Sequence, residues 1–218
     1  MRIFKTLLCV IVLLLCSMLS VFASPVIIRH ADTATLSNII LRYLSVKVPN
    51  FSLINSTPNS LTFSGLKENV WTGNVQRVLM FTFVENKDQS ITLNANGQFR
   101  SAGSPLVGSV GGNLNADEAQ QLMLTIKYAC DGRYKFGFSW EKKKITDITP
   151  NSPASKAGLR IGDKLVSINN NKPTDTAIYE AVGARHITFK IKRKSEEKTI
   201  EIDGVYMKSE EVQKELGI

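Results

Sequence analysis

The sequence predicts an α+β protein: a helix–antiparallel sheet–helix domain followed by a small β-barrel or sandwich with two helices. A run of apolar residues at helical spacing follows residue 32, and short alternating segments fill residues 51–99. Between residues 149 and 171, Gly, Pro and Asn form a dense series of turn signals. A sheet covered by two helices would bury the apolar faces of the first part.

The first predicted helix follows Asp32 and Thr33, either of which can cap its start. Pro49 is expected to end it, because proline cannot continue a helix. Its apolar residues recur at i, i+3, i+4, i+7 and i+8 and give one apolar face: Leu36, Ile39, Ile40, Tyr43 and Leu44.

Strand signals follow this helix. Residues 51–63 alternate around a central turn, which is typical of a hairpin, and residues 75–84 are rich in β-branched and aromatic side chains. A further strand begins at Ile91 and is expected to end at the tight turn Asn96-Gly97.

A loop and a second helix complete the first part. Residues 101–113 contain four glycines, three serines and one proline, which indicates a loop or an irregular edge segment. Asn115 and Glu118 then have capping-box spacing. The expected buried stripe of the helix is Ala119, Leu122, Met123 and Ile126.

The composition excludes several classes of protein. The chain has 218 residues, 43% hydrophobic, with a formal net charge of +8, which excludes disorder, collagen-like repeats and a multi-pass membrane protein. Only two histidines, His30 and His186, are available for a metal cluster or a Ser-His-Asp triad. Ser109 lies in a glycine-rich setting, but a nucleophilic serine needs a base and an orienting carboxylate. We therefore expect no enzymatic activity, no cofactor and no metal.

The first 23 residues predict a secretory signal peptide. A short basic start precedes an apolar run, and Val21-Phe22-Ala23 offers permissive residues for cleavage before Ser24. The apolar run is shorter than the roughly 20 residues of a spanning helix. We expect an exported chain, in the periplasm or at the cell surface. A retained N-terminal anchor and lipidation at Cys16 stay open as alternatives.

The mature chain is expected to divide near residue 131. The junction Cys130-Asp131-Gly132-Arg133 is a helix stop, which separates an N-terminal domain of residues 24–130 from a second domain of residues 131–204. Residues 205–218 are predicted to form a short amphipathic tail helix. Cys130 is expected to be a buried apolar residue at a helix end.

The most specific motif lies in residues 152–169 and reads Ser-Pro-Ala, Ala-Gly-Leu-x-x-Gly-Asp-x-Leu-x-x-Ile-Asn. Pro153 is placed to start a one-turn helix that ends at Gly158, and Gly162-Asp163 turns into a strand. This series resembles the PDZ domain, and the resemblance covers residues 134–202. The order of the elements resembles the circularly permuted form found in bacterial exported proteins.

The resemblance implies a peptide-binding groove. In PDZ domains a ligand segment adds as a strand to a sheet edge beside the long helix, and loop amides hold its terminal carboxylate. The alternative for Phe136, Phe138 and Trp140 is that their side chains belong partly to the core. The expected binding residues are Lys135, Phe136, Gly137, Phe138, Ser139 and Trp140 on the loop and edge strand, with Ile178 and Val182 on the helix.

We therefore expect an exported, non-enzymatic protein that binds a protein or peptide. An accessory or regulatory subunit of an envelope protease and a purely structural module are the alternatives. Nucleic acid is not an expected partner, because the positive charge is spread over the chain. Lys142-Lys143-Lys144 is expected to be a solvated turn, and its contact with an anionic membrane surface stays open. The sequence does not specify the oligomeric state.

Overall fold

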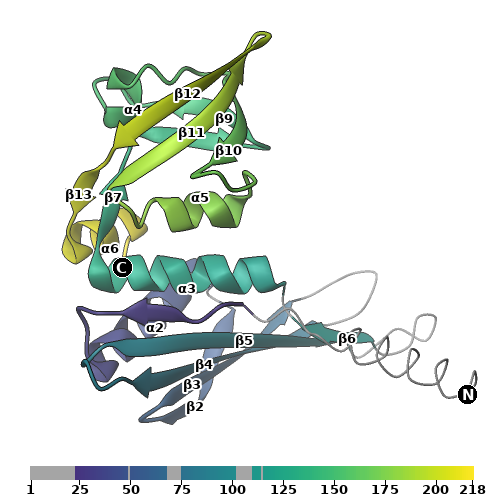
Figure 1. The fold of residues 1–218 in the computed structure, drawn as a ribbon. Helices are drawn as coiled ribbons and strands as arrows, with labels where there is room; N and C mark the ends of the chain where they lie inside the picture. The colour runs from purple at the N-terminus through teal and green to yellow at the C-terminus, as the bar shows by residue number, and fades with distance from the viewer. Residues whose placement is uncertain (1–22, 49, 68–74, 102–109, 114) are drawn as a thin grey trace, which may run out of the picture.

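The computed structural model describes residues 23–48, 50–67, 75–101, 110–113 and 115–218. The predicted signal peptide, with Cys16, and most of the loop at 101–113 lie outside the described residues. The described chain has an α+β architecture with two large sheets and one two-stranded sheet (Figure 1). One large sheet lies below helix α3 (Ala116–Asp131) and the other lies above it in that view.

The N-terminal sheet has six antiparallel strands. Its strands β4 and β5 pair along eleven residues each and form the longest ladder of this sheet. In spatial order the strands are β1 (Val26–Ile28), β5 (Ile91–Ser101), β4 (Val75–Glu85), β3 (Ser60–Lys67) and β2 (Phe51–Thr57), with β6 (Val110–Asn113) also paired to β5.

The expected turn at Asn96-Gly97 was wrong. Both residues lie inside β5, where Asn96 pairs with Met80 and Gly97 pairs with Leu79 of β4. The local preference of Asn-Gly for a hairpin turn is outweighed by the continuous ladder with β4. The short first strand, β1, was not predicted either. It pairs with residues 91–93 of β5, a contact that local sequence patterns do not reveal.

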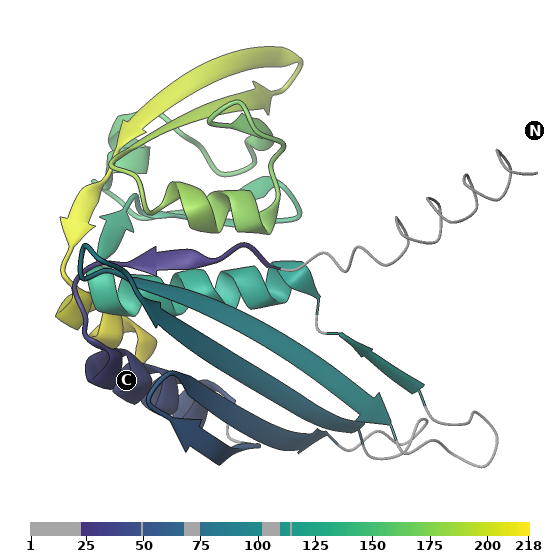
Figure 2. The same ribbon diagram turned by 60° about the horizontal axis from the view of Figure 1, so that its bottom comes forward.

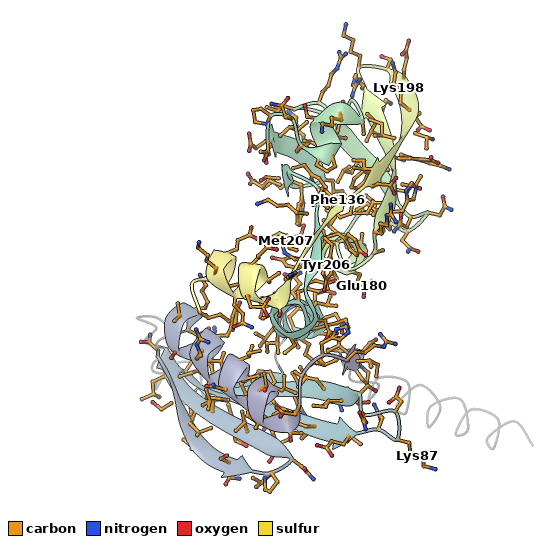
Figure 3. All side chains as sticks on the ribbon, turned by 90° about the vertical axis from the view of Figure 1, so that its left-hand side faces the viewer. Lys87, Phe136, Glu180, Lys198, Tyr206 and Met207 are labelled. Atoms are coloured by element: carbon orange, nitrogen blue, oxygen red, sulfur yellow. The ribbon has the colours of Figure 1, made fainter. Side chains whose placement is uncertain are left out.

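Helices α2 (Thr33–Lys47) and α3 lie on one face of this sheet (Figures 1 and 3). Asp32 caps α2, since its carboxylate accepts a hydrogen bond from the Thr35 amide at 2.7 Å. The hydrogen bonds from Thr35 lower the pKa of Asp32. The predicted capping box of α3 is absent, because Asn115 instead accepts a bond from the Asp117 amide.

Helix α3 is buried on more than one side. Its buried residues extend beyond a single stripe: Ala119, Gln120, Met123, Leu124, Ile126, Tyr128, Ala129 and Cys130. An amphipathic helix that covers one sheet would leave its other side in water. Here α3 contacts β1 and β5 on one side, and α5 (Asp175–Ala181) and α6 (Ser209–Leu216) on the other. The buried apolar residues accordingly form one continuous cluster through both parts of the chain.

The C-terminal part is built on an open five-stranded sheet. It does not close into the barrel that was one of the expected forms, because β12 and β8 are its two edges and do not pair with each other or, on their outer sides, with another described strand. Two short helices, α4 (Pro153–Lys156) and α5, pack with it. The strands in spatial order are β12 (Glu196–Asp203), β11 (His186–Arg193), β10 (Lys164–Ile168), β9 (Lys144–Ile148) and β8 (Phe138–Glu141).

A third, two-stranded sheet ties the tail to the junction. Strand β7 (Arg133–Lys135) pairs with β13 (Val205–Met207), so the predicted tail helix begins only at Ser209. Figure 2 shows β13 leading from the C-terminal sheet down to α6 beside α3. The Tyr206 hydroxyl donates to the Asp131 carbonyl at 2.8 Å. The division into folding units at residue 131 stays a prediction. No helix of the described residues is long and apolar enough to cross a membrane.

The C-terminal part contains an ion pair between buried Asp163 and half-buried Arg193. Arg193 donates from Nε to Asp163 Oδ1 and from Nη2 to Oδ2, both at 2.7 Å, and Nη2 also donates to the Gly158 carbonyl. The Arg160 amide donates to Asp163 Oδ2 at 2.9 Å. Burial acts to raise the pKa of Asp163, but these hydrogen bonds outweigh it and hold that pKa below its usual value.

Replacing the buried carboxylate should cost much of the stability of this part. We expect Asp163→Asn to lower the free energy of unfolding by about 2–3 kcal/mol, because the Arg193 guanidinium loses its charge partner. Glu196→Gln removes an exposed ion pair with Lys198 and should change the free energy of unfolding by less than about 0.5 kcal/mol. Urea denaturation at neutral pH measures both values. Since the folded pKa of Asp163 is lowered, its contribution to stability should be complete above the usual pKa of the carboxyl and be lost as the pH falls through the lowered pKa of the folded state. Equal effects of the two variants would contradict this role of Asp163.

The thiol of Cys130 should be inert in the folded protein. Burial, with the nearby Asp131 charge, raises its pKa to about 12, and the residue is only 4% exposed. The thiolate is the reactive form, so an aromatic disulfide reagent at about pH 8 should modify Cys130 only after denaturant is added. A Cys130→Ser variant measures the reagent signal that comes from the other two cysteines. Rapid modification of the folded protein would show that α3 opens at this end.

Candidate functional site

A cavity of about 450 Å³ lies where the C-terminal part meets α3 and α6. It is lined by the segment that links the two parts and by residues from four helices, α2, α3, α5 and α6. Its lining comprises Tyr43 of α2; Thr125 and Tyr128 of α3; residues 133–140; Thr149; Tyr179 and Val182; and Val212, Glu215 and Leu216 of α6.

The loop before β8 is shaped by Gly137, whose φ is +77°. A side chain is excluded there, because a Cβ atom would lie 2.2 Å from the Ser152 Cβ. The Phe136 carbonyl accepts a hydrogen bond from the Ala154 amide at 2.9 Å. The Gly137 carbonyl accepts from the Thr149 amide at 2.9 Å and from the Ser152 hydroxyl at 3.2 Å. Hydrogen bonds therefore hold the loop against the segment that leads into α4.

These carbonyl bonds orient two amides. A peptide unit is planar and trans, so its N–H points opposite to its C=O. The N–H groups of Gly137 and Phe138 therefore point away from the α4 side, and both residues line the cavity. The Gly137 amide donates no hydrogen bond to any residue that the structure describes. Two adjacent backbone donors in this orientation can bind an anion or the carbonyl groups of an added strand.

Aromatic side chains form the apolar part of the cavity. Phe136 is 3% exposed and belongs to the core, which was the alternative considered for it. Phe138 and Trp140 are half-buried. Phe138 packs edge-on against buried Phe189 with ring centroids 5.3 Å apart, and its ring lies 5.9 Å from Trp140. Figure 3 shows Phe136 within the C-terminal part, above the labelled residues at the boundary. The row of rings thus runs from the core to the cavity.

Helix α5 turns Tyr179 and Val182 toward the cavity. These residues are three positions apart and share one face of the helix. Ile178, expected on this wall, is instead 1% exposed and is absent from the lining. The neighbouring position, Tyr179, was not predicted, because Ile178 and Tyr179 lie four and three positions before Val182 and spacing alone does not separate them. A charge at Ile178 would therefore disrupt the core rather than probe the cavity.

The N-terminal part also contributes to the lining. The Tyr128 hydroxyl donates to the Tyr179 carbonyl at 2.6 Å, which fixes α3 against α5. Burial raises the pKa of both Tyr43 and Tyr128, so their hydroxyls stay protonated and can donate. Tyr43 and the α6 residues were not expected in the site, because their approach depends on packing between distant segments.

The charged groups of the site are few. Arg133 Nη2 forms an ion pair with Glu215 Oε2 at 2.9 Å, and Lys135 is exposed beside the loop. Lys142 and Lys143 form the exposed turn between β8 and β9 and have positive φ, whereas Lys144, also exposed, is the first residue of β9. Contact of these lysines with an anionic surface stays a prediction. In the described parts of the chain, no group of three or more His, Cys, Asp or Glu residues is placed to hold a metal ion.

Seven of the eight predicted residues are therefore brought together in one lining, and Ile178 is the exception. Ser139 and Lys135 are exposed members of that set. The peptide-binding role of these residues stays a prediction.

Comparison with known proteins identifies the C-terminal part. Residues 144–193 match the family model described as PDZ domain, which agrees with the sequence resemblance. The match covers β9 through β11 with α4 and α5. No curated protein matches the chain in sequence.

Solved structures give weaker similarities. The HtrA-type protease AlgW with a tripeptide is 13% identical, with a TM-score of 0.35 over 71% of this chain and 62% of that chain. This chain thus spans less than two thirds of that protease. The serine endoprotease from Yersinia pestis is 11% identical, with a TM-score of 0.33 over 77% of this chain and 98% of that chain. A PDZ domain protein from Parabacteroides distasonis is 13% identical, with a TM-score of 0.28 over 79% and 63%.

The loop geometry predicts unequal effects of alanine at two glycines. Gly158→Ala should cost about 1 kcal/mol of stability, because φ is +80° but no atom lies within 4 Å of a new Cβ. Gly137→Ala should cost about 3 kcal/mol, since a clash with Ser152 is added to a similar backbone strain. Chemical denaturation of both variants measures the difference. If Gly137→Ala were no more destabilising than Gly158→Ala, the loop would not be fastened to Ser152 in solution.

Proposed function

Because the C-terminal part of this chain is a PDZ domain, we propose that the protein is an exported, non-enzymatic binder of other proteins. It takes up the C-terminal or an extended segment of a partner in the cavity between β8 and α5. The segment adds to the free edge of β8, and its side chains enter the aromatic lining. PDZ domains as a class bind peptides in this manner.

The observation that carries the proposal is the pair of amides at Gly137 and Phe138. Both point to the open side of a loop whose carbonyls are already bonded to Ala154, Thr149 and Ser152. A terminal carboxylate would accept hydrogen bonds from these amides, and such charge-assisted bonds are stronger than neutral ones. Exposed Lys135 adds a positive charge beside them.

The rest of the cavity favours an apolar end residue. Phe136, Phe138 and Val182 supply apolar surface next to the amides. A small ligand site of this kind combines an apolar lining with a few fixed polar groups, and a volume of about 450 Å³ lies within the usual range. Export is supported by the sequence of residues 1–23, which has the order of a signal peptide.

Binding should depend on a free terminal carboxylate. The full chain is titrated by calorimetry with hexapeptides that end in Val, Leu, Ile or Phe, each as the free acid and as the amide. We expect at least one free acid to bind, and its amide to bind about tenfold more weakly, since charged hydrogen bonds to the amides are lost. Equal affinity of acid and amide would contradict carboxylate capture, and the absence of binding by every peptide would contradict the proposed function.

A matched pair of variants locates the binding surface. Val182→Thr has nearly the same shape but places a hydroxyl in the cavity lining, so it should weaken binding several-fold. Val205→Thr makes the same change at a position that is 62% exposed and outside the lining, and should leave the affinity as in the wild type. Thermal unfolding of both variants checks that they are folded.

A further inference from the structure

Trp140 bridges the two walls of the groove. From edge strand β8, its indole Nε1 donates to Asp175 Oδ1 on α5, over a distance of 2.9 Å. Its ring also packs edge-on against Tyr179, with centroids 6.0 Å apart and an interplanar angle of 80°. The strand and the helix that form the groove are thus connected directly across it. We call Trp140, Asp175 and Tyr179 the cross-groove bar.

The cavity ends at this bar. Trp140 and Tyr179 are part of its lining. Among the described residues, the lining includes nothing from β8 beyond Trp140 and nothing from α5 before Tyr179. Asp175, at the first turn of α5, therefore lies past the end of the open space. The bar is partly exposed, so it closes the groove at its rim and is not hidden beneath it.

The position of the bar sets the length of a ligand. A β-strand rises about 3.3–3.4 Å per residue, so Trp140 lies roughly 7 Å along the strand from Phe138. An added strand whose end is held at the Gly137 and Phe138 amides would have room for about two residues before it met the indole. Tyr128 of α3 and Leu216 of α6 also line the cavity and limit its width.

We propose that the cross-groove bar makes this PDZ domain a reader of very short chain ends, with Trp140 as the residue that determines ligand length. This inference rests on the proposed function, because it concerns the same cavity. The ligand class is a chain end of about two residues, with a free carboxylate and an apolar or aromatic final side chain. Residues further from the end are excluded from the groove by the indole and run outward to solvent.

The experiment compares peptide lengths in the full chain. Acetylated peptides of two, three, four and six residues, each with the same two final residues, are titrated by calorimetry. The readout is the ratio of the dissociation constant of the dipeptide to that of the hexapeptide. In the wild type this ratio should stay within about twofold, because the added residues find no strand to pair with. An affinity that rises steadily from the dipeptide to the hexapeptide would overturn the proposed length limit while leaving the proposed function intact.

Variants of the bar separate its two contacts. Trp140→Phe keeps a ring beside Tyr179 but loses the indole N–H that donates to Asp175. Asp175→Ala removes the acceptor of that hydrogen bond. Each should raise the ratio by about tenfold, as one or two further backbone hydrogen bonds become available to the hexapeptide. Asp175→Asn keeps an oxygen acceptor at the same place, so its ratio should stay near that of the wild type. Ratios for Trp140→Phe and Asp175→Ala that equal the wild-type value would overturn the inference.

The case without wild-type binding is also decisive. If the hexapeptide binds Trp140→Phe but no peptide binds the wild type, the bar closes the groove completely and the length limit of two residues is wrong. If no peptide binds any of the proteins, the proposed function fails and the inference fails with it. The circular dichroism spectrum and unfolding temperature of each variant show whether a loss of binding reflects a loss of fold.

Discussion

The structure depends on the burial of helix α3 from two sides. An apolar helix that packed only on the N-terminal sheet would leave Leu124, Tyr128 and Ala129 without cover unless other elements supplied it. Helices α5 and α6 supply that cover, and the bond from the Tyr128 hydroxyl to the Tyr179 carbonyl satisfies a polar group that burial would otherwise penalise. The two sheets are consequently joined through one shared helix. The cavity owes its location to the same helix, since it opens where α3, α5 and α6 meet.

The site combines a rigid loop with a restricted groove. Gly137 is fixed by its own positive φ and by the contact with Ser152, so the two amides beside it are oriented before any ligand arrives. Such preorganisation reduces the entropy that binding must overcome. The aromatic row from Phe189 to Trp140 gives the floor of the groove its shape. Binding chemistry is therefore concentrated at one end of the groove.

Much of the fold could be predicted from the sequence where the signals are local. The apolar periodicity of α2, the hairpin of β2 and β3, and the series from Ser152 to Asn169 are read from neighbouring residues and agree with the structure. The failures involve distant partners. Strand β7 pairs with β13 some 70 residues later, and β5 continues through Asn96-Gly97 because β4 lies beside it. The same limit applies to the site. Seven lining residues follow from the family resemblance, whereas Tyr43 and Leu216 approach only through tertiary packing.

The pairing of β7 with β13 decides how the protein can be divided. A fragment that stopped at residue 204 would retain the whole five-stranded sheet, with its loop and edge strand, and would look like a complete domain by its motif. It would nevertheless lose the strand that pairs with Arg133–Lys135, the Tyr206 bond to the end of α3, and the face of α6 that closes one side of the cavity. A piece with the complete cavity lining thus extends through α6 and reaches back past α3 to Tyr43 of α2. The boundary of the sequence motif and the boundary of the cavity are different places in this chain.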